Sequence, residues 1–226
     1  VLISMVEHAQ QCQAAVQELL AQRVEALLVN VPLDDPDAEQ LQKMASPVPV
    51  LFLDVSPSAQ VNSLVFNAGQ GAALGAEHLI SLGHQRIALL SGPESSVSAR
   101  ARLAGWKTTL AQAGLEVADE VHGDWSAASG YEKGHQLLSG SQLPDAILVA
   151  NDQMALGVMR ACVEKGIAIP GQISIVGFDD TADSAWFSPP LTTVRQAFRE
   201  AGELSSWRNG NALQRRGPAA EPPASG

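Results

Sequence analysis

The sequence has few basic residues and no long apolar run, and each shortage excludes a class of protein. Lys and Arg number 14 against 24 Asp and Glu, which gives a formal net charge of −10. A surface this acidic repels phosphate backbones, so the chain by itself is expected to be a poor nucleic-acid binder. The apolar runs all fall well short of the about 18 residues that a membrane span requires. The sequence therefore predicts neither a DNA-binding surface nor a membrane segment.

Cysteine is also scarce. Cys12 and Cys162 fall in helical patterns far apart in the sequence, which favours reduced core thiols in a cytoplasmic protein over a disulfide. The histidines show no metal-ligand spacing, and the cysteines have no histidine near them in a metal-binding pattern. We therefore expect no metal and no cofactor. A signal peptide is not visible, although the N-terminus looks cut.

What the sequence does have is a regular alternation of short apolar runs and helical patterns. Strands are expected at residues 1–6, 26–29, 49–53, 86–90, 117–121, 146–149 and 173–176. Helices are expected at residues 10–22, 37–44, 69–82, 99–113, 128–138 and 153–165. This order predicts an α/β protein with doubly wound parallel sheets covered by helices.

The last 22 residues, 205–226, break this pattern. Proline, glycine, alanine and arginine dominate, so the segment cannot bury enough apolar surface to offset the entropy of ordering it. A disordered or aberrant tail is favoured over the alternative, a basic arm for nucleic acid carrying Arg208, Arg215 and Arg216.

Two apparent motifs carry little weight. Gly69, Gly71 and Gly75 resemble a dinucleotide-binding fingerprint, but the third glycine is one residue too far along and the acidic partner is missing. A helix N-terminus packed under a loop is the favoured reading. Asp179 and Asp180 resemble a catalytic pair, but neighbouring side chains on an extended segment point to opposite faces, which disfavours an enzyme.

Short polar residues follow several of the expected strands. Ligands of open α/β sheets bind beyond the carboxyl ends of the strands, and carboxylates, amides and an arginine fork suit sugar hydroxyls, while rings cover the apolar sugar face. The polar candidates are Asn30, Asp54, Arg102, Asn151 and Asp179, and the ring candidates are Phe66, Trp125 and Phe198. By pattern alone, Trp125 is equally typical of a side chain packed in the core and of a ligand-binding ring. Arg102 is slightly more typical of a solvated helix face than of a ligand-binding residue.

Several segments resemble the lactose-repressor family of transcription regulators. They include Arg-Leu-Ala-Gly-Trp at 102–106, Gly-Asp-Trp-Ser-Ala at 123–127 and Val-Ala-Asn-Asp-Gln-Met-Ala-Leu-Gly at 149–157. Further matches lie at residues 20–24, 32–35, 51–56, 95–100 and 189–193, so that the resemblance runs from about residue 1 to about residue 204.

The resemblance implies two lobes of the periplasmic-binding-protein type, truncated at both ends. Residues 1–66 would form one incomplete lobe, rejoined by residues 196–204, and residues 67–193 the other. It implies a galactoside pocket with Asp54, Arg102, Asn151 and Asp179 on the hydroxyls, Phe66, Trp125 and Phe198 as the apolar wall, and Asn30, Ser98 and Gln196 as further pocket residues. It also implies a homodimer interface that contains Leu156, Trp186 and Phe187.

The sequence is therefore interpreted as the inducer-binding and dimerising core of a repressor, without its DNA-binding headpiece. Operator DNA would be bound only through that missing headpiece. A sugar-binding protein of a transport system shares the fold and is the first alternative. A sugar-processing enzyme is the second, and it is disfavoured because no acid/base pair converges.

Overall fold

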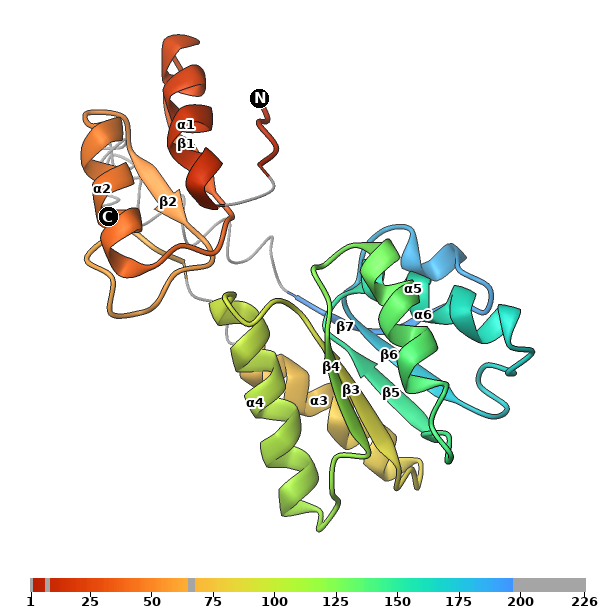
Figure 1. Cartoon of the computed structure of the whole chain (residues 1–226). Helices are drawn as coiled ribbons and strands as arrows, with labels where there is room; N and C mark the ends of the chain where they lie inside the picture. Colours follow the sequence, from red (N-terminus) through yellow and green to blue (C-terminus); the bar gives the residue numbers. More distant parts are fainter. Residues whose placement is uncertain (1, 7–8, 65–67, 197–226) are drawn as a thin grey trace, which may run out of the picture. The chain divides into compact units, whose positions relative to one another are not determined.

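The computed structural model describes residues 2–6, 9–64 and 68–196 (Figure 1). Its first part holds two short parallel strands, which pair from Leu27 opposite Val50 to Val29 opposite Phe52. The elements there are η1 (Ala9–Gln11), α1 (Cys12–Ala21), β1 (Leu27–Val29), α2 (Asp35–Ala45) and β2 (Val50–Phe52). A single bridge joins Phe52 to Ser63. Apolar side chains of these elements form one hydrophobic cluster between residues 12 and 61.

The second part is a five-stranded, all-parallel sheet with the strand order β4-β3-β5-β6-β7. Its elements are α3 (Ala68–Ser81), β3 (Ile87–Ser91), α4 (Val97–Gln112), β4 (Asp119–His122), α5 (Ala127–Leu137), β5 (Ala146–Val149), α6 (Asp152–Glu164), β6 (Ser174–Asp179), η2 (Ser184–Trp186) and β7 (Thr192–Arg195). Helices α3 and α4 cover one face and α5 and α6 the other (Figure 1). The doubly wound α/β class is confirmed, whereas the division into lobes near residue 66 stays a prediction.

Burial on both faces explains why the central strands read as unbroken apolar runs. All residues of β3 and β5 are buried between the two helical layers. Side-chain caps begin the helices that follow: Ser96 accepts a hydrogen bond from the backbone of Ala99, and Asn151 accepts one from Met154. Strand β3 therefore leads into α4, and β5 into α6, through short capped turns at the carboxyl edge of the sheet.

Glycine allows the helices to pack in close contact. A Cβ atom on Gly157 of α6 would lie 2.0 Å from the carbonyl oxygen of Ala127, and one on Gly105 of α4 would lie 2.4 Å from that of Gly69. The prediction that the glycines at 69–75 lie at the start of a helix is confirmed, whereas the loop that was expected to cover them is wrong. They lie inside α3 against α4 and the sheet, where close helix packing requires small residues, rather than under a loop.

Replacing Gly157 with alanine is expected to destabilise the protein by about 1–3 kcal/mol, because α5 and α6 would have to move apart. Urea unfolding followed by circular dichroism would measure the change. Gly171→Ala is a matched control, since a Cβ atom there would meet only the Ala168 side chain at 3.5 Å. Equal unfolding midpoints for the two variants would contradict the packing argument.

Two sequence expectations need correction. Residues 2–6 form no strand in the described structure, and Leu2, Ile3 and Met5 are exposed. Their apolar character suggested a strand, but a strand requires a neighbour to bond with, and the described residues place none beside them. Strand β7 was missed because it is a half-exposed edge strand with polar threonines, and it begins two residues after Pro190.

The two thiols are buried and free, in agreement with the sequence prediction. Burial raises the pKa of Cys162 to about 11 and also raises that of Cys12, so both stay protonated and unreactive. Within residues 2–6, 9–64 and 68–196, the helices are too short or too polar to cross a membrane.

Candidate functional site

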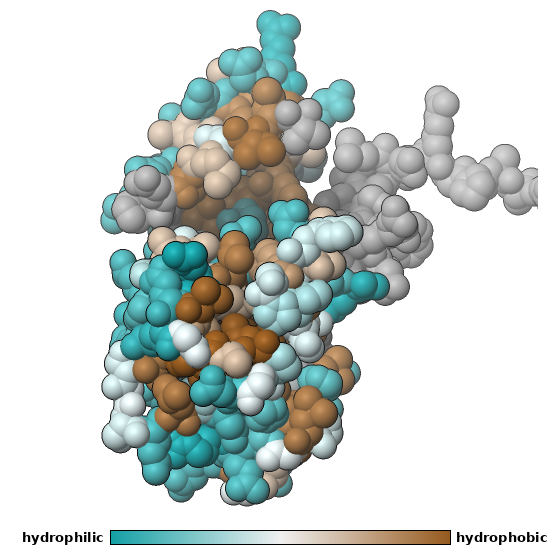
Figure 2. Space-filling view, turned by 90° about the vertical axis from the view of Figure 1, so that its right-hand side faces the viewer, coloured by the Kyte–Doolittle hydropathy of each residue, from teal (hydrophilic) through white to brown (hydrophobic). Residues whose placement is uncertain are grey.

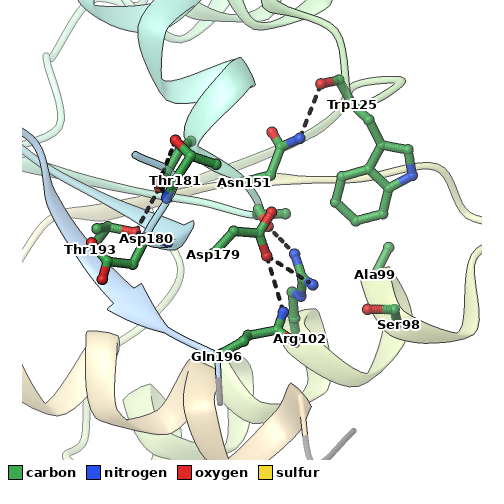
Figure 3. Close-up of polar contacts among 12 residues, drawn as sticks. Ser98, Ala99, Arg102, Trp125, Asn151, Asp179, Asp180, Thr181, Thr193 and Gln196 are labelled. Atoms are coloured by element: carbon green, nitrogen blue, oxygen red, sulfur yellow. Dashed lines mark hydrogen bonds and ion pairs between the residues drawn. The ribbon is translucent and has the colours of Figure 1, made fainter. Parts of the chain in front are cut away.

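Six of the predicted ligand-binding residues lie around the carboxyl edge of the five-stranded sheet (Figure 3). They are Ser98 and Arg102 of α4, Trp125 before α5, Asn151 at the start of α6, Asp179 at the end of β6, and Gln196 after β7. From β3 the chain passes into α4, which covers one face of the sheet, and it enters β5 from α5, which covers the other face. Parallel sheets bind ligands where the connections diverge in this way.

Arg102 is buried at this edge, with only 6% of its surface exposed. Its guanidinium lies over the ring of Phe178 at 4.0 Å and over that of Trp125 at 5.3 Å. One amino group donates to the carbonyl oxygen of Ala150. The solvated helix face that pattern alone slightly favoured is therefore wrong, because α4 turns this residue toward the rings. Phe178 had not been singled out, although it directly precedes Asp179.

Asp179 is the anionic partner of Arg102, with 3.5 Å between Oδ1 and Nη2. Gln196 Nε2 donates to the same oxygen at 3.0 Å. Burial raises the pKa of Asp179 to about 6; Arg102 and Gln196 counteract this rise, and the charge of Asp152 adds to it. Burial also lowers the pKa of Arg102, so for both groups the loss of water outweighs the benefit of the pair.

Asn151 has a structural role as well as the predicted ligand role. Its Oδ1 accepts from Met154 N at 2.9 Å and caps α6, while its Nδ2 donates to the carbonyl oxygen of Trp125 at 3.0 Å. An amide nitrogen carries two hydrogens, so it can still donate to a ligand. The bond to Trp125 holds a residue whose φ is +76°. Trp125 is half-buried; its ring packs against the core and also lies beside the Arg102 guanidinium.

The remaining predicted pocket residues are less well grouped. Asp54 is buried, and its Oδ1 accepts from the backbone nitrogen of Ser98 at 2.9 Å. Asn30 follows β1 and is exposed. Phe66 and Phe198, the other two predicted ring surfaces, lie outside the described residues.

The backbone at Asp179 and Asp180 is not extended, contrary to the argument used against a catalytic pair. Their φ angles are +111° and +54°. The two carboxylates nevertheless bind different partners: Asp179 pairs with Arg102, and Asp180 with Arg195. Each carboxylate is thus held by its own cation, which does not favour a shared acid/base function.

Sequence reasoning missed Asp152, which is 1% exposed. Its Oδ1 accepts from the Thr193 hydroxyl at 2.6 Å, and its Oδ2 accepts from the backbone nitrogen of Thr181 at 2.9 Å. A short polar residue after Asn151 gives no sign of this role, because both partners belong to distant segments. Among the described residues, histidine, cysteine and carboxylate side chains do not gather in threes that could hold a metal ion.

The predicted dimer residues differ in exposure. Trp186 is 86% exposed and Leu156 is 40% exposed. Phe187 is half-buried and packs against the core of its own sheet. Figure 2 shows the face on which α6 and η2 lie, with brown apolar residues in several places among teal ones. Val163 of α6 is also largely exposed.

Comparison with known proteins identifies the family. Residues 76–205 match the model of the periplasmic binding protein-like domain. The chain belongs to this family. Periplasmic binding protein-like domains with solved structures include the lactose repressor bound to the anti-inducer ONPF in the induced state, with a TM-score of 0.84 and 51% identity. That match covers 94% of this chain and 80% of the other.

Curated relatives place the domain in the lactose-repressor-type branch, which confirms the resemblance seen in the sequence. It is 52% identical over 207 residues to the lactose operon repressor of Escherichia coli (strain K12), covering 91% of this chain and 58% of the relative. It is 45% identical over 191 residues to that of Klebsiella pneumoniae, covering 84% and 54%. The chain thus spans somewhat more than half the length of these relatives. They are operon repressors, so the transport alternative is not favoured.

Proposed function

We propose that this chain is the galactoside-binding and dimerising core of a lactose-repressor-type transcription regulator. The observation that carries the proposal is the ion pair of buried Arg102 with partly buried Asp179 at the carboxyl edge of the sheet, where the Arg102 guanidinium lies over the rings of Trp125 and Phe178. The support beside it is 52% identity to the Escherichia coli lactose operon repressor.

The chemistry of the site suits a sugar. A sugar presents neighbouring hydroxyls on one side and C–H groups on another. Arg102 donates to hydroxyl oxygens, Asp179 accepts from hydroxyl hydrogens, and Asn151 can donate through its amide. The Trp125 ring provides an apolar surface for the C–H groups. Asn30, Asp54, Ser98, Gln196, Phe66 and Phe198 complete the proposed pocket.

The proposed regulation couples two sites. Residues 1–66, rejoined near 196–204, would form one lobe and residues 67–193 the other, with the inducer between them. Inducer would stabilise one arrangement of the lobes that weakens operator binding by the headpiece, which is linkage through a two-state element. With a net charge of −10, the core itself would not bind the operator. Such a regulator would act in the cytoplasm as a binding protein and not as an enzyme.

Calorimetry with methyl β-D-galactoside tests the proposal, with methyl β-D-glucoside as the control that differs only at the C4 hydroxyl. We expect heat of binding from the galactoside and at least tenfold weaker binding of the glucoside, because one reversed hydroxyl leaves a buried polar group unpaired. Equal affinity for both sugars would contradict galactoside specificity. The absence of binding at millimolar sugar, or release of methanol during incubation, would refute the proposed function.

Replacing Trp186 with aspartate is expected to convert a dimer to a monomer, since a charge would be placed in an apolar contact. The side chain is 86% exposed, so the substitution leaves the fold intact. Sedimentation velocity at tens of micromolar protein measures the result. Leu74→Asp is the control, because Leu74 is 58% exposed on α3 at the opposite face of the sheet. If Leu74→Asp dissociates the dimer and Trp186→Asp does not, the interface does not contain Trp186.

A further inference from the structure

The segment that carries Asp179 has an uncommon backbone. Asp179 and Asp180 are consecutive non-glycine residues with φ angles of +111° and +54°. L-residues rarely adopt this region because the Cβ atom crowds the backbone, and such conformations persist only where surrounding contacts hold them. Something must therefore stabilise the end of β6 in the conformation that turns Asp179 toward Arg102.

Three hydrogen bonds to Asp152 supply this support, and their donors belong to Thr181 and Thr193, which are labelled in Figure 3. Thr181 lies directly after the strained pair, and its backbone nitrogen and hydroxyl donate to Asp152 Oδ2 at 2.9 and 3.3 Å. Thr193 of β7 donates its hydroxyl to Asp152 Oδ1 at 2.6 Å. The same Thr193 oxygen accepts from the backbone nitrogen of Asp180 at 3.3 Å. Asp152 is thus linked to the strained pair by two routes: through Thr181, which follows the pair, and through Thr193, which contacts the backbone of Asp180.

The sheet makes room for this carboxylate at Gly177. A Cβ atom on Gly177 would lie 2.4 Å from Asp152 Oδ1 and 2.8 Å from the Leu191 side chain. A residue larger than glycine at position 177 would displace the Asp152 carboxylate from Thr193. The buried Asp152 carboxylate receives three hydrogen bonds and occupies space that only glycine at position 177 leaves open. Together these groups form a preorganised polar network.

We propose that Asp152, acting through Thr181 and Thr193, is a positioning residue that holds the Asp179 carboxylate in the orientation that binds sugar hydroxyls beside Arg102. This inference deepens the proposed function and rests on it. Asn151 caps α6, and Asp152 is the first residue of that helix. The start of α6 then serves two sugar contacts: Asn151 directly, and Asp179 through the network.

Substitution of Thr193 tests the inference without changing any charge. Thr193→Val removes the hydroxyl that joins Asp152 to the backbone of Asp180, and we expect affinity for methyl β-D-galactoside to fall at least about tenfold. Thr193→Ser keeps the hydroxyl and should restore affinity to within about twofold of the original. Thr109→Val is the matched control: its buried hydroxyl donates to Gly105 O at 2.8 Å within α4, so its loss should leave affinity unchanged.

A double-mutant cycle separates positioning from a general loss of stability. In an Asp179→Asn background, Thr193→Val should weaken galactoside binding no further, because the group that it positions is already altered. If Thr193→Val has the same effect in both backgrounds, or if serine fails to restore affinity, the network does not act through Asp179 and the inference is overturned.

A measurement without sugar keeps the inference separate from the proposed function. The pKa of Asp179, raised by burial to about 6, can be followed by carboxyl carbon NMR in the unliganded protein. Thr193→Val should move this pKa toward the ordinary value, because the carboxylate turns toward water, while Thr109→Val should not. An unchanged pKa in Thr193→Val would refute positioning. A shifted pKa without any sugar binding would support positioning and refute the proposed function.

Discussion

Replacing Arg102 with lysine is expected to weaken galactoside binding by about 10- to 100-fold, although the charge is retained. Lysine has no planar fork, so it cannot donate to Ala150, pair with Asp179 and face a sugar hydroxyl at once. Its ammonium also loses the stacking of the guanidinium on Phe178. Calorimetry on the purified chain would measure the change in affinity.

Arg100→Lys is the matched control for this experiment. Arg100 lies on the same helix, but it is exposed, and it donates to the carbonyl oxygen of Glu94 at 2.6 Å. Its replacement should leave both affinity and stability within experimental error. Equal affinities for wild type and Arg102→Lys would exclude Arg102 from the sugar site.

Asp179→Asn is expected to change the pH dependence of stability. The pKa of Asp179 is raised from an ordinary 3.8 to about 6 in the folded protein. The folded state therefore binds the proton more tightly than the unfolded state, and the associated stability is fully present below pH 3.8 and lost as the pH rises through 6. Between pH 4 and 7, wild type should lose on the order of 2 kcal/mol relative to Asp179→Asn.

Urea unfolding of both proteins at several pH values would measure this difference. A difference in unfolding free energy that does not vary with pH would contradict the raised pKa. Galactoside affinity should have the opposite trend in wild type. It should fall as the pH drops below about 6, since protonation removes an acceptor, whereas the asparagine variant should show a flatter profile.

Strand ends were the most predictable part of the site. Asn151 and Asp179 follow apolar runs that form β5 and β6, and the carboxyl ends of neighbouring parallel strands must lie together. Arg102 could not be placed by pattern, because its burial depends on the rings of Phe178 and Trp125 from other elements.

The role of Asp152 could not be predicted from the sequence, for a related reason. Its role depends on Thr181 and Thr193, which lie 29 and 41 residues away. The strained backbone at 179–180 was also unpredictable, because local preference favours extended conformations there and tertiary hydrogen bonds override it. Sequence patterns report local preference and burial, so contacts of this length become visible only in the folded chain.

The two roles of Asn151, the helix cap that the structure shows and the sugar contact that we propose, limit how sugar preference could diverge among descendants of this protein. Its side-chain oxygen caps the N-terminus of α6 by accepting a hydrogen bond from the backbone nitrogen of Met154, so any replacement must also be able to cap a helix. Aspartate, serine and threonine satisfy that condition, whereas larger or apolar residues would cost about 1 kcal/mol or more of helix stability. Exposed Asn30 and half-buried Ser98 carry no such obligation at a helix cap. New specificities would therefore arise more readily at these two positions, while position 151 stays within a narrow set of small polar residues.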